Sequence, residues 1–426
     1  MKQLESGGAL VAFGGGPSRV VNRTFSSLVL NLKKSGVKRI YSPPFGLRGL
    51  LDECPPKVYD LSRQPDALLH KIANQAGAVS GTARRKLNEA KGEPERLLEL
   101  LKKNDIRYFY MIGGDDTASV CLQLQVAANA CNYEISTFHV AKTIDNDLNG
   151  HHHTPGFGSA ALYVAHVVQG IEADNRSIGG VQIVVCMGKD AGYLAASASL
   201  AKHDEKSGPH AFFLPEHEYF SIQYFVNNFT GKVSEIFEKF GRALVVVSEG
   251  IGITTVSSEA KKRVPLLKYV LENKGDTVIG DNFGGISLSR GTSLGDFLVN
   301  LVKSTLKTDV RSTTLGYPQR SFPALVSNQD ALDAWTVGRE AVRYTIQGFG
   351  AGSVALTAPG SDTSTVLLPL QLVGTGKREM PKDFITYSGC LLEIKKFSEY
   401  AVPLVGAENL PAPVADLLPI YYELKS

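Results

Sequence analysis

Residues 108–119 read YFYMIGGDDTAS, and this stretch indicates both the class of fold and the place of a site. The apolar run Tyr108–Ile112 is rich in residues that favour strands, and it ends in two glycines and the adjacent acids Asp115 and Asp116. A periodic segment from Ala118 to Ala130 follows and predicts a helix. Glycines and acids at the end of a buried strand are typical of an open α/β sheet, which binds ligands at that edge.

The same alternation of short apolar runs and longer periodic segments continues along the chain and predicts an α/β fold with largely parallel sheets. Its length predicts two or three domains, with the quietest boundaries at Asn149–Gly156 and Tyr317–Pro323. The expected strands are Gly8–Phe13, Arg39–Ser42, Tyr108–Ile112, Ser136–Val140, Val181–Cys186, His210–Leu214, Ala243–Val247 and Ser353–Thr357. The expected helices are Val20–Ser35, Pro94–Lys103, Ala118–Ala130, Gly158–Glu172, Ile222–Phe240 and Asp330–Gly348.

Composition excludes several classes of function. The 426 residues hold 45 Lys and Arg against 42 Asp and Glu, a net charge of +3, so there is no excess of positive charge for nucleic acid. No window approaches about 18 uninterrupted apolar residues, so no membrane span is expected. The 5 cysteines lack CxxC spacing, which argues against a zinc site or a disulfide framework. We therefore expect a cytoplasmic enzyme whose 42 glycines line ligand loops.

The first expected strand ends in Gly14-Gly15-Gly16. Glycines between a strand and a helix let backbone N–H groups approach a phosphate. The segment matches neither the GxxxxGK[ST] nor the GxGxxG pattern, and a simple tight turn is the alternative.

The adjacent carboxylates of Asp115 and Asp116 suit a Mg²⁺ ion that keeps most of its waters and bridges phosphate oxygens. The alternative is structural, because Asp116 or Thr117 could cap the helix that follows.

Residues 141–148 read AKTIDNDL and follow another expected strand. In an extended chain Asp145 and Asp147 would share one side, so that one serves as general base and the other helps to hold a metal or water. Lys142 adds a positive point charge beside them. A solvated acidic turn is the alternative.

Together these three segments resemble the phosphofructokinase family, which transfers a phosphoryl group to the C1 hydroxyl of fructose 6-phosphate. Four further segments resemble family motifs in the expected order, and the resemblance covers about residues 8–350. These segments are TPGFGSA at 154–160, MGKDAG at 187–192, SEG at 248–250 and LGYPQR at 315–320.

The resemblance implies two α/β domains with mainly parallel sheets flanked by helices, and an active site in the cleft between them. Residues 1–155 and 319–426 would form the domain that binds the donor phosphates and Mg²⁺. Residues 156–318 would form the domain that binds the sugar phosphate. It also implies small-molecule substrates, no nucleic-acid or membrane partner, and a homo-oligomer, dimer or tetramer.

The resemblance also implies a role for each matching residue. Asp145 would be the base that deprotonates the C1 hydroxyl, Lys142 and Asp116 would be the other catalytic residues, and Asp115 would hold Mg²⁺. The donor phosphates would contact Gly15, Gly16, Arg84, Thr117 and Lys142. The sugar phosphate would contact Thr143, Asp147, Met187, Gly188, Lys189, Glu249, Tyr317 and Arg320, together with Arg311 lent by a neighbouring subunit.

The choice of phosphoryl donor can be argued from charge. Family members that use ATP typically carry glycine where this chain has Asp116 and Lys142, the pattern of the diphosphate-dependent branch. A carboxylate 4 Å from an ATP phosphate repels it by about 4 kcal/mol at an effective dielectric constant of 20. An ammonium near the leaving phosphate stabilises its developing charge. The pattern therefore predicts reversible transfer from inorganic diphosphate, giving fructose 1,6-bisphosphate and phosphate in glycolysis and gluconeogenesis.

Two departures from the family pattern leave alternatives open. Lys189 replaces an arginine, and Gly180 stands where family members usually carry a basic residue that reaches the sugar phosphate. They favour one alternative, a non-catalytic paralogue that senses sugar phosphates. The other alternative is an ATP-dependent phosphofructokinase, against which Asp116 and Lys142 argue. A seven-carbon sugar phosphate is a further candidate substrate.

The segment Glu172–Arg176 is expected to be a solvated helix end.

Overall fold

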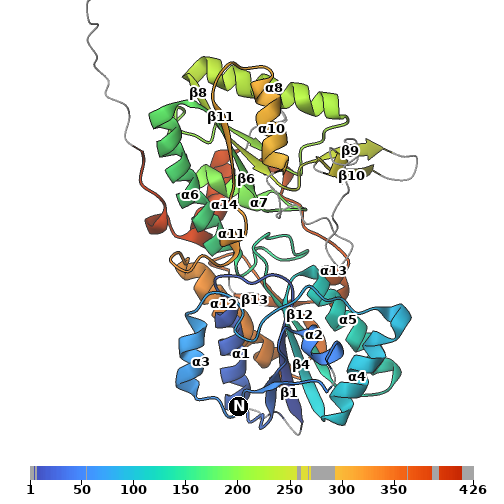
Figure 1. The fold of residues 1–426 in the computed structure, drawn as a ribbon. Helices are drawn as coiled ribbons and strands as arrows, with labels where there is room; N and C mark the ends of the chain where they lie inside the picture. The colour runs from blue at the N-terminus through green and yellow to red at the C-terminus, as the bar shows by residue number, and fades with distance from the viewer. Residues whose placement is uncertain are drawn as a thin grey trace, which may run out of the picture.

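The computed structural model describes residue 4 and residues 7–53, 55–256, 261–266, 268–269, 293–361, 363–385 and 393–414. The chain forms two lobes, which lie one above the other in Figure 1. Of the five cysteines, Cys121, Cys131 and Cys186 are free thiols. Cys54 and Cys390 lie outside the described residues.

The lower lobe in Figure 1 is built on a larger sheet, in which the described residues form seven strands in the order β13-β12-β5-β4-β1-β2-β3. Neighbours from β12 to β2 pair in parallel, and the edge strands β13 and β3 pair antiparallel. The strands are β1 (Gly8–Phe13), β2 (Ile40–Ser42), β3 (Tyr59–Asp60), β4 (Ile106–Gly113), β5 (Ser136–Ala141), β12 (Ala351–Leu356) and β13 (Thr365–Leu368).

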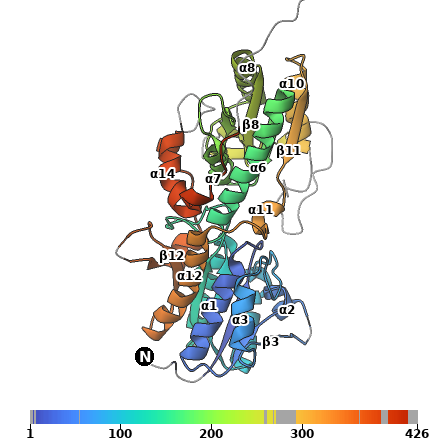
Figure 2. The ribbon, with the colours of Figure 1, turned by 90° about the vertical axis from the view of Figure 1, so that its left-hand side faces the viewer.

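Helices cover both faces of this sheet, because β1 carries apolar side chains on both of its faces. Val11 belongs to the core under helices α1 and α12, whereas Leu10 belongs to the core under α4 and α5. Figure 2 shows α1, α3 and α12 side by side on one face. The helices of this lobe are α1 (Val21–Lys34), α2 (Leu47–Leu51), α3 (Asp66–Ala73), α4 (Glu93–Lys103), α5 (Asp115–Ala130), α12 (Asn328–Ile346) and α13 (Leu370–Gly374), with 3-10 turn η1 (Glu89–Lys91).

The upper lobe is built on a smaller, fully parallel sheet of four strands among the described residues, in the order β11-β6-β8-β7. Helices α6, α7 and α14 pack on one face, and α8 and α10 pack on the other. The strands are β6 (Gly180–Cys186), β7 (Ala211–Phe213), β8 (Arg242–Ser248) and β11 (Val310–Thr314), beside a hairpin of β9 (Gly252–Val256) and β10 (Lys261–Pro265). The helices are α6 (Phe157–Ile178), α7 (Tyr193–Ser197), α8 (Ile222–Phe240), α10 (Ser293–Lys303) and α14 (Ile394–Val405), with 3-10 turns η2 (Ala198–Ala201), η4 (Lys382–Phe384) and η5 (Ala407–Asn409).

The chain crosses between the lobes more than once. It first crosses between β5 and α6, and it returns near α11 (Pro318–Ser321). It then crosses a third time after β13, because Phe397 and Leu404 of α14 belong to the core of the smaller-sheet lobe. The C-terminal part of the chain therefore contributes β12 and β13 to one lobe and α14 to the other.

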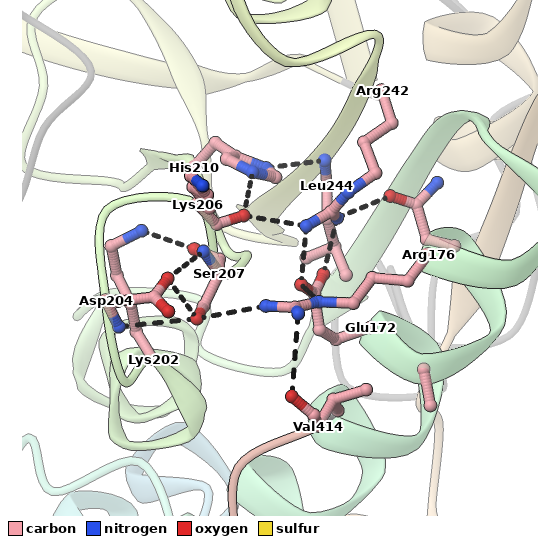
Figure 3. Close-up of polar contacts among 12 residues, drawn as sticks. Glu172, Arg176, Lys202, Asp204, Lys206, Ser207, His210, Arg242, Leu244 and Val414 are labelled. Carbon is pink, nitrogen blue, oxygen red and sulfur yellow. Dashed lines mark hydrogen bonds and ion pairs between the residues drawn. The ribbon is translucent and has the colours of Figure 1, made fainter. Parts of the chain in front are cut away.

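A buried ion cluster contradicts the expectation that Glu172–Arg176 is a solvated helix end. Glu172 is only 1% exposed, and both of its oxygens accept hydrogen bonds from Arg242 at 2.8 and 2.9 Å. Arg176 donates to the same carboxylate at 2.8 Å and also reaches the carbonyl of Val414 (Figure 3). Although burial alone would raise it, the two guanidinium groups hold the pKa of Glu172 below its ordinary value.

Local sequence does not indicate this burial, since the arginine that pairs with Glu172 is 70 residues away on β8.

Within the described residues, no helix is long and apolar enough to cross a membrane.

Candidate active site

A cavity of about 430 Å³ opens between the lobes, at the carboxyl ends of β1, β4 and β5 and of β6 and β8. It brings together most of the predicted site residues. Those that line it are Gly15, Gly16, Arg84, Asp115, Asp116, Thr117, Lys142, Thr143, Asp145, Asp147, Met187, Lys189, Glu249 and Arg320. Gly188, Arg311 and Tyr317 lie outside its lining.

The glycine loop after β1 presents carbonyl oxygens to a buried lysine. The Lys142 ammonium donates to the carbonyls of Gly14 at 3.1 Å and Gly16 at 2.5 Å. The N–H of Gly15, expected to face a phosphate, instead donates to the Ala83 carbonyl at 3.2 Å. In this structure the loop therefore fixes the position of Lys142.

Close packing requires one of these glycines and disfavours a side chain at another. A Cβ at Gly14 would lie 2.4 Å from the Thr117 hydroxyl, and a Cβ at Gly16 would lie 3.3 Å from Nε of Arg320. A side chain at Gly14 would push Thr117 away from the loop, whereas at Gly16 the Arg320 side chain would need to move by only a few tenths of an ångström.

Helix α5 begins three residues earlier than expected, so both acids lie in its first turn. Its N-cap residue is Gly114, and no side chain caps the helix, which rules out the expected alternative of capping by Asp116 or Thr117. Carboxylates at this end interact favourably with the helix dipole. Asp116 is 57% exposed at the cavity mouth and forms an ion pair of 2.8 Å with Lys86, whereas Asp115 is 28% exposed.

Residues 143–148 form a turn, so the expectation of an extended chain was wrong. Asn146 lies between the two aspartates with φ +60° in the left-handed region and is fully buried. Asp145 and Asp147 still line the same cavity, because the turn brings both carboxylates to its wall.

The turn is held from behind by side chains on other elements. The side-chain NH₂ of Asn146 donates to the hydroxyl of Tyr400 on α14 at 2.6 Å. The side-chain oxygen of Asn146 accepts from the N–H of Thr154 at 3.1 Å. The Tyr400 hydroxyl in turn donates to the His152 carbonyl at 2.9 Å. These bonds stabilise the left-handed conformation of Asn146.

Burial and crowding shift the pKa values of the groups around the turn. Burial raises the pKa of Asp145, and burial together with the Asp145 charge raises the pKa of Asp147 to about 7. The same two causes raise the pKa of Glu249 to about 7. Burial and the charge of Arg320 lower the pKa of Lys142 to about 8. Such clustering of perturbed groups in a cleft is typical of active sites.

The smaller-sheet lobe supplies Met187, Lys189 and Glu249 from the ends of β6 and β8. Gly188 has φ +127°, and a Cβ there would meet the Ala191 carbonyl at 2.5 Å, so its role is to shape this loop. Gly180 has φ +80° and a Cβ there would lie 2.5 Å from the Asp309 carbonyl, so the backbone excludes a basic side chain at this position.

Arg320 lines the cavity, and its guanidinium lies 4.7 Å from the centre of the Tyr317 ring. Arg311 lies near the start of β11, away from the cavity. It forms ion pairs with Asp174 at 3.6 Å and Asp309 at 3.7 Å.

The cavity also contains charged residues that were not predicted from the sequence. The most prominent is Lys377, whose ammonium lies 3.5 Å from a carboxylate oxygen of Asp115 and 3.6 Å from one of Asp147, and forms a closer ion pair with Asp190. Burial opposes its charge, but the carboxylates raise the pKa of Lys377 above its ordinary value. Lys86 and Asp190 could have been predicted from the sequence, because Lys86 lies two residues after Arg84 and Asp190 directly follows Lys189.

The carboxylates suit a divalent metal together with a phosphate ligand. Among the described residues, no group of three or more His, Cys, Asp or Glu side chains is arranged to hold a metal by itself. Mg²⁺ usually keeps several waters and binds through one or two carboxylates plus substrate phosphates. Asp115 and Asp147, which face a common cation in this structure, provide such a pair.

The class of protein follows from the sequence and agrees with this geometry. A family model described as phosphofructokinase matches residues 9–345, and the chain belongs to this family. Lys377 and Tyr400 lie beyond the matched residues.

Relatives match nearly the whole chain. The pyrophosphate–fructose 6-phosphate 1-phosphotransferase of Rhodospirillum rubrum is 36% identical over 404 residues, covering 94% of each chain. The protein of the same name from Xanthomonas campestris is 32% identical and covers 99% of this chain and 97% of its own. The crystal structure of a pyrophosphate-dependent phosphofructokinase from Nitrosospira multiformis superposes with a TM-score of 0.76 at 28% identity, covering 97% of this chain and 95% of its own.

Proposed function

We propose that this protein transfers a phosphoryl group from inorganic diphosphate to the C1 hydroxyl of fructose 6-phosphate, reversibly, giving fructose 1,6-bisphosphate and phosphate. The observation that carries the proposal is the buried Lys142 ammonium, fixed by two glycine carbonyls in the cavity that also holds Asp145. The names of the two relatives point to the same donor and acceptor.

Asp145 is the general base of this mechanism. It accepts the proton of the C1 hydroxyl as the hydroxyl oxygen forms a bond to the transferring phosphorus. The raised pKa of the Asp145 carboxyl makes it a better proton acceptor than an ordinary aspartate.

The bond between the transferring phosphorus and the bridging oxygen of diphosphate breaks in the same step. The leaving phosphate gains negative charge, which the Lys142 ammonium stabilises from the glycine loop. Arg84 and Thr117 lie on the same cavity wall and would bind the donor phosphates. Because diphosphate releases little more free energy than the sugar ester stores, the same groups catalyse the reverse reaction.

Asp115 and Asp147 would hold Mg²⁺, and the ion, when bound, would supply positive charge that neutralises the phosphate oxygens. Asp116 and its ion pair with Lys86 lie at the cavity mouth, where they would meet the longer phosphate chain of a nucleotide. Selection against ATP is therefore assigned to the Asp116 carboxylate.

The sugar phosphate would bind on the side of the smaller-sheet lobe. Cavity-lining contacts would come from Met187, Lys189, Glu249 and Arg320, and from Thr143 and Asp147 on the turn after β5. Tyr317 would act beside the Arg320 guanidinium, and Gly188 would shape the loop between Met187 and Lys189. Arg311 faces away from its own cavity and would serve a neighbouring subunit, which requires a homo-oligomer. We expect this assembly to be cytoplasmic.

The test is a coupled assay of fructose 1,6-bisphosphate formation with Mg²⁺, comparing diphosphate and ATP at equal concentration. Turnover with diphosphate alone is the expected result. Turnover with ATP alone would refute the assigned roles of Asp116 and Lys142. Absence of turnover with either donor, also with a seven-carbon sugar phosphate, would favour a non-catalytic sensor.

A further inference from the structure

The ammonium of Lys377 is surrounded by acidic groups from both lobes. Asp115 belongs to the larger-sheet lobe, and Asp190 follows β6 of the smaller-sheet lobe. Asp147 lies on the turn that precedes the first crossing between them. Among the described residues, Lys377 is the cation that contacts all three carboxylates, since Lys142 is held by the glycine loop.

The backbone at Lys377 and Arg378 is paired with residues 147–148, so the Lys377 side chain has a defined starting point. Lys377 forms an antiparallel bridge with Leu148, and the N–H of Arg378 donates to the Asp147 carbonyl at 2.8 Å. The Arg378 guanidinium packs over Tyr193 and Tyr400, at 4.9 and 5.8 Å from the ring centres. The Lys377 backbone is therefore held in place, while its four-carbon side chain can change conformation.

A metal and the Lys377 ammonium compete for the same carboxylates. Mg²⁺ binds carboxylate oxygens at about 2.0–2.1 Å and carries a shell of waters. An ammonium 3.5 Å from Asp115 and 3.6 Å from Asp147 occupies the space between these groups that the ion and its waters need. Two cations so close would also repel each other.

We propose that Lys377 is an internal counter-ion that occupies the metal's place in the free enzyme and transfers its contact to the diphosphate when the metal arrives. The inference rests on the proposed function for the identity of the anion. Lysine suits this role because its compact charge sits on a flexible stem with three donors. The exchange keeps the carboxylates compensated in both states, and it couples the binding of the metal to the binding of the donor.

The first test is a titration of the full-length protein with Mn²⁺ alone, followed by the electron paramagnetic resonance signal of the free ion. The variants are Lys377→Met and, as a matched control, Lys382→Met, which removes an exposed lysine five residues further along the chain. We expect Lys377→Met to bind Mn²⁺ at least tenfold more tightly than the unaltered protein, while Lys382→Met and the charge-preserving Lys377→Arg show no such gain. Equal Mn²⁺ affinity in Lys377→Met and the unaltered protein would overturn the proposal.

The second test adds diphosphate. In the unaltered protein diphosphate should tighten Mn²⁺ binding strongly, whereas in Lys377→Met this gain should shrink by about tenfold because the ammonium no longer reaches the anion. An undiminished gain would refute the transfer to diphosphate. If Lys377→Met does not fold, Lys377→Gln is measured in the same titrations. The titration with Mn²⁺ alone contains neither donor nor sugar, so its outcome is independent of whether the proposed reaction is correct.

Discussion

Replacing Asp116 with glycine should relax the exclusion of ATP, and the structure sets the size of the effect. The side chain is 57% exposed and its carboxylate is paired with the Lys86 ammonium at 2.8 Å. Because this carboxylate is close to bulk water, it would repel an ATP phosphate 4 Å away by about 1 kcal/mol. A partly buried carboxylate would repel the same phosphate by about 4 kcal/mol. Removing the carboxylate also frees Lys86 to attract the nucleotide, by about another 1 kcal/mol.

The expected result is a gain in ATP affinity of about thirtyfold for Asp116→Gly, and of about fivefold when Lys86→Met is combined with it. The assay is competitive inhibition of the diphosphate-dependent reaction by ATP, which reports binding even where ATP is not turned over. Affinity for diphosphate, which is bound deeper near Lys142, should change by less than about threefold. An inhibition constant for ATP that is unchanged in Asp116→Gly would refute the electrostatic argument.

Three further predictions concern the chemistry and its support. Asp145→Asn should lower kcat by about 10²–10⁴-fold with little change in KM for diphosphate, and steady-state kinetics showing an unchanged kcat would remove Asp145 as the base. Tyr400→Phe should lower kcat about tenfold with unchanged KM values, because the turn around Asn146 loses its support. The control Tyr110→Phe removes a comparable buried hydroxyl from the larger-sheet lobe and should cost stability alone. Because the free protein lowers the pKa of Lys142 to about 8, its ammonium deprotonates as the pH rises through that value. We therefore expect kcat/KM for diphosphate to fall above about pH 8, and a profile that stays flat to pH 10 would contradict this role.

Local sequence patterns predicted the central strands because each is a continuous apolar run bounded by polar or glycine residues. All eight expected strands are present, and the run at Gly8–Phe13 matches β1 at both ends. Strands β3, β9, β10, β11 and β13 were missed, since each is short or lies at an edge of its sheet. Edge strands such as β11, which carries Arg311 and three hydroxyl-bearing residues, lack the apolar run that marks a central strand.

Site residues were predictable where a short motif follows a strand, as at Asp115 and Asp145. Lys377 carries no such signal, because it lies in a segment without a strong periodic pattern and far along the chain from the carboxylates that it contacts. The left-handed turn at Asn146 was likewise hidden. Its conformation depends on Tyr400, which is 254 residues away. Contacts of this length come from tertiary packing and leave no local pattern.

The late position of Lys377 in the chain has a consequence for biosynthesis. Every recognisable motif, from Gly14 to Arg320, leaves the ribosome before Lys377 is made. During that interval Asp115, Asp147 and Asp190 have no ammonium between them, and Tyr400 is not yet present to hold the turn at Asn146. A nascent chain therefore carries the base and the glycine loop before the residues that complete the cleft, and competence for phosphoryl transfer arises only after Lys377 and Tyr400 have been made.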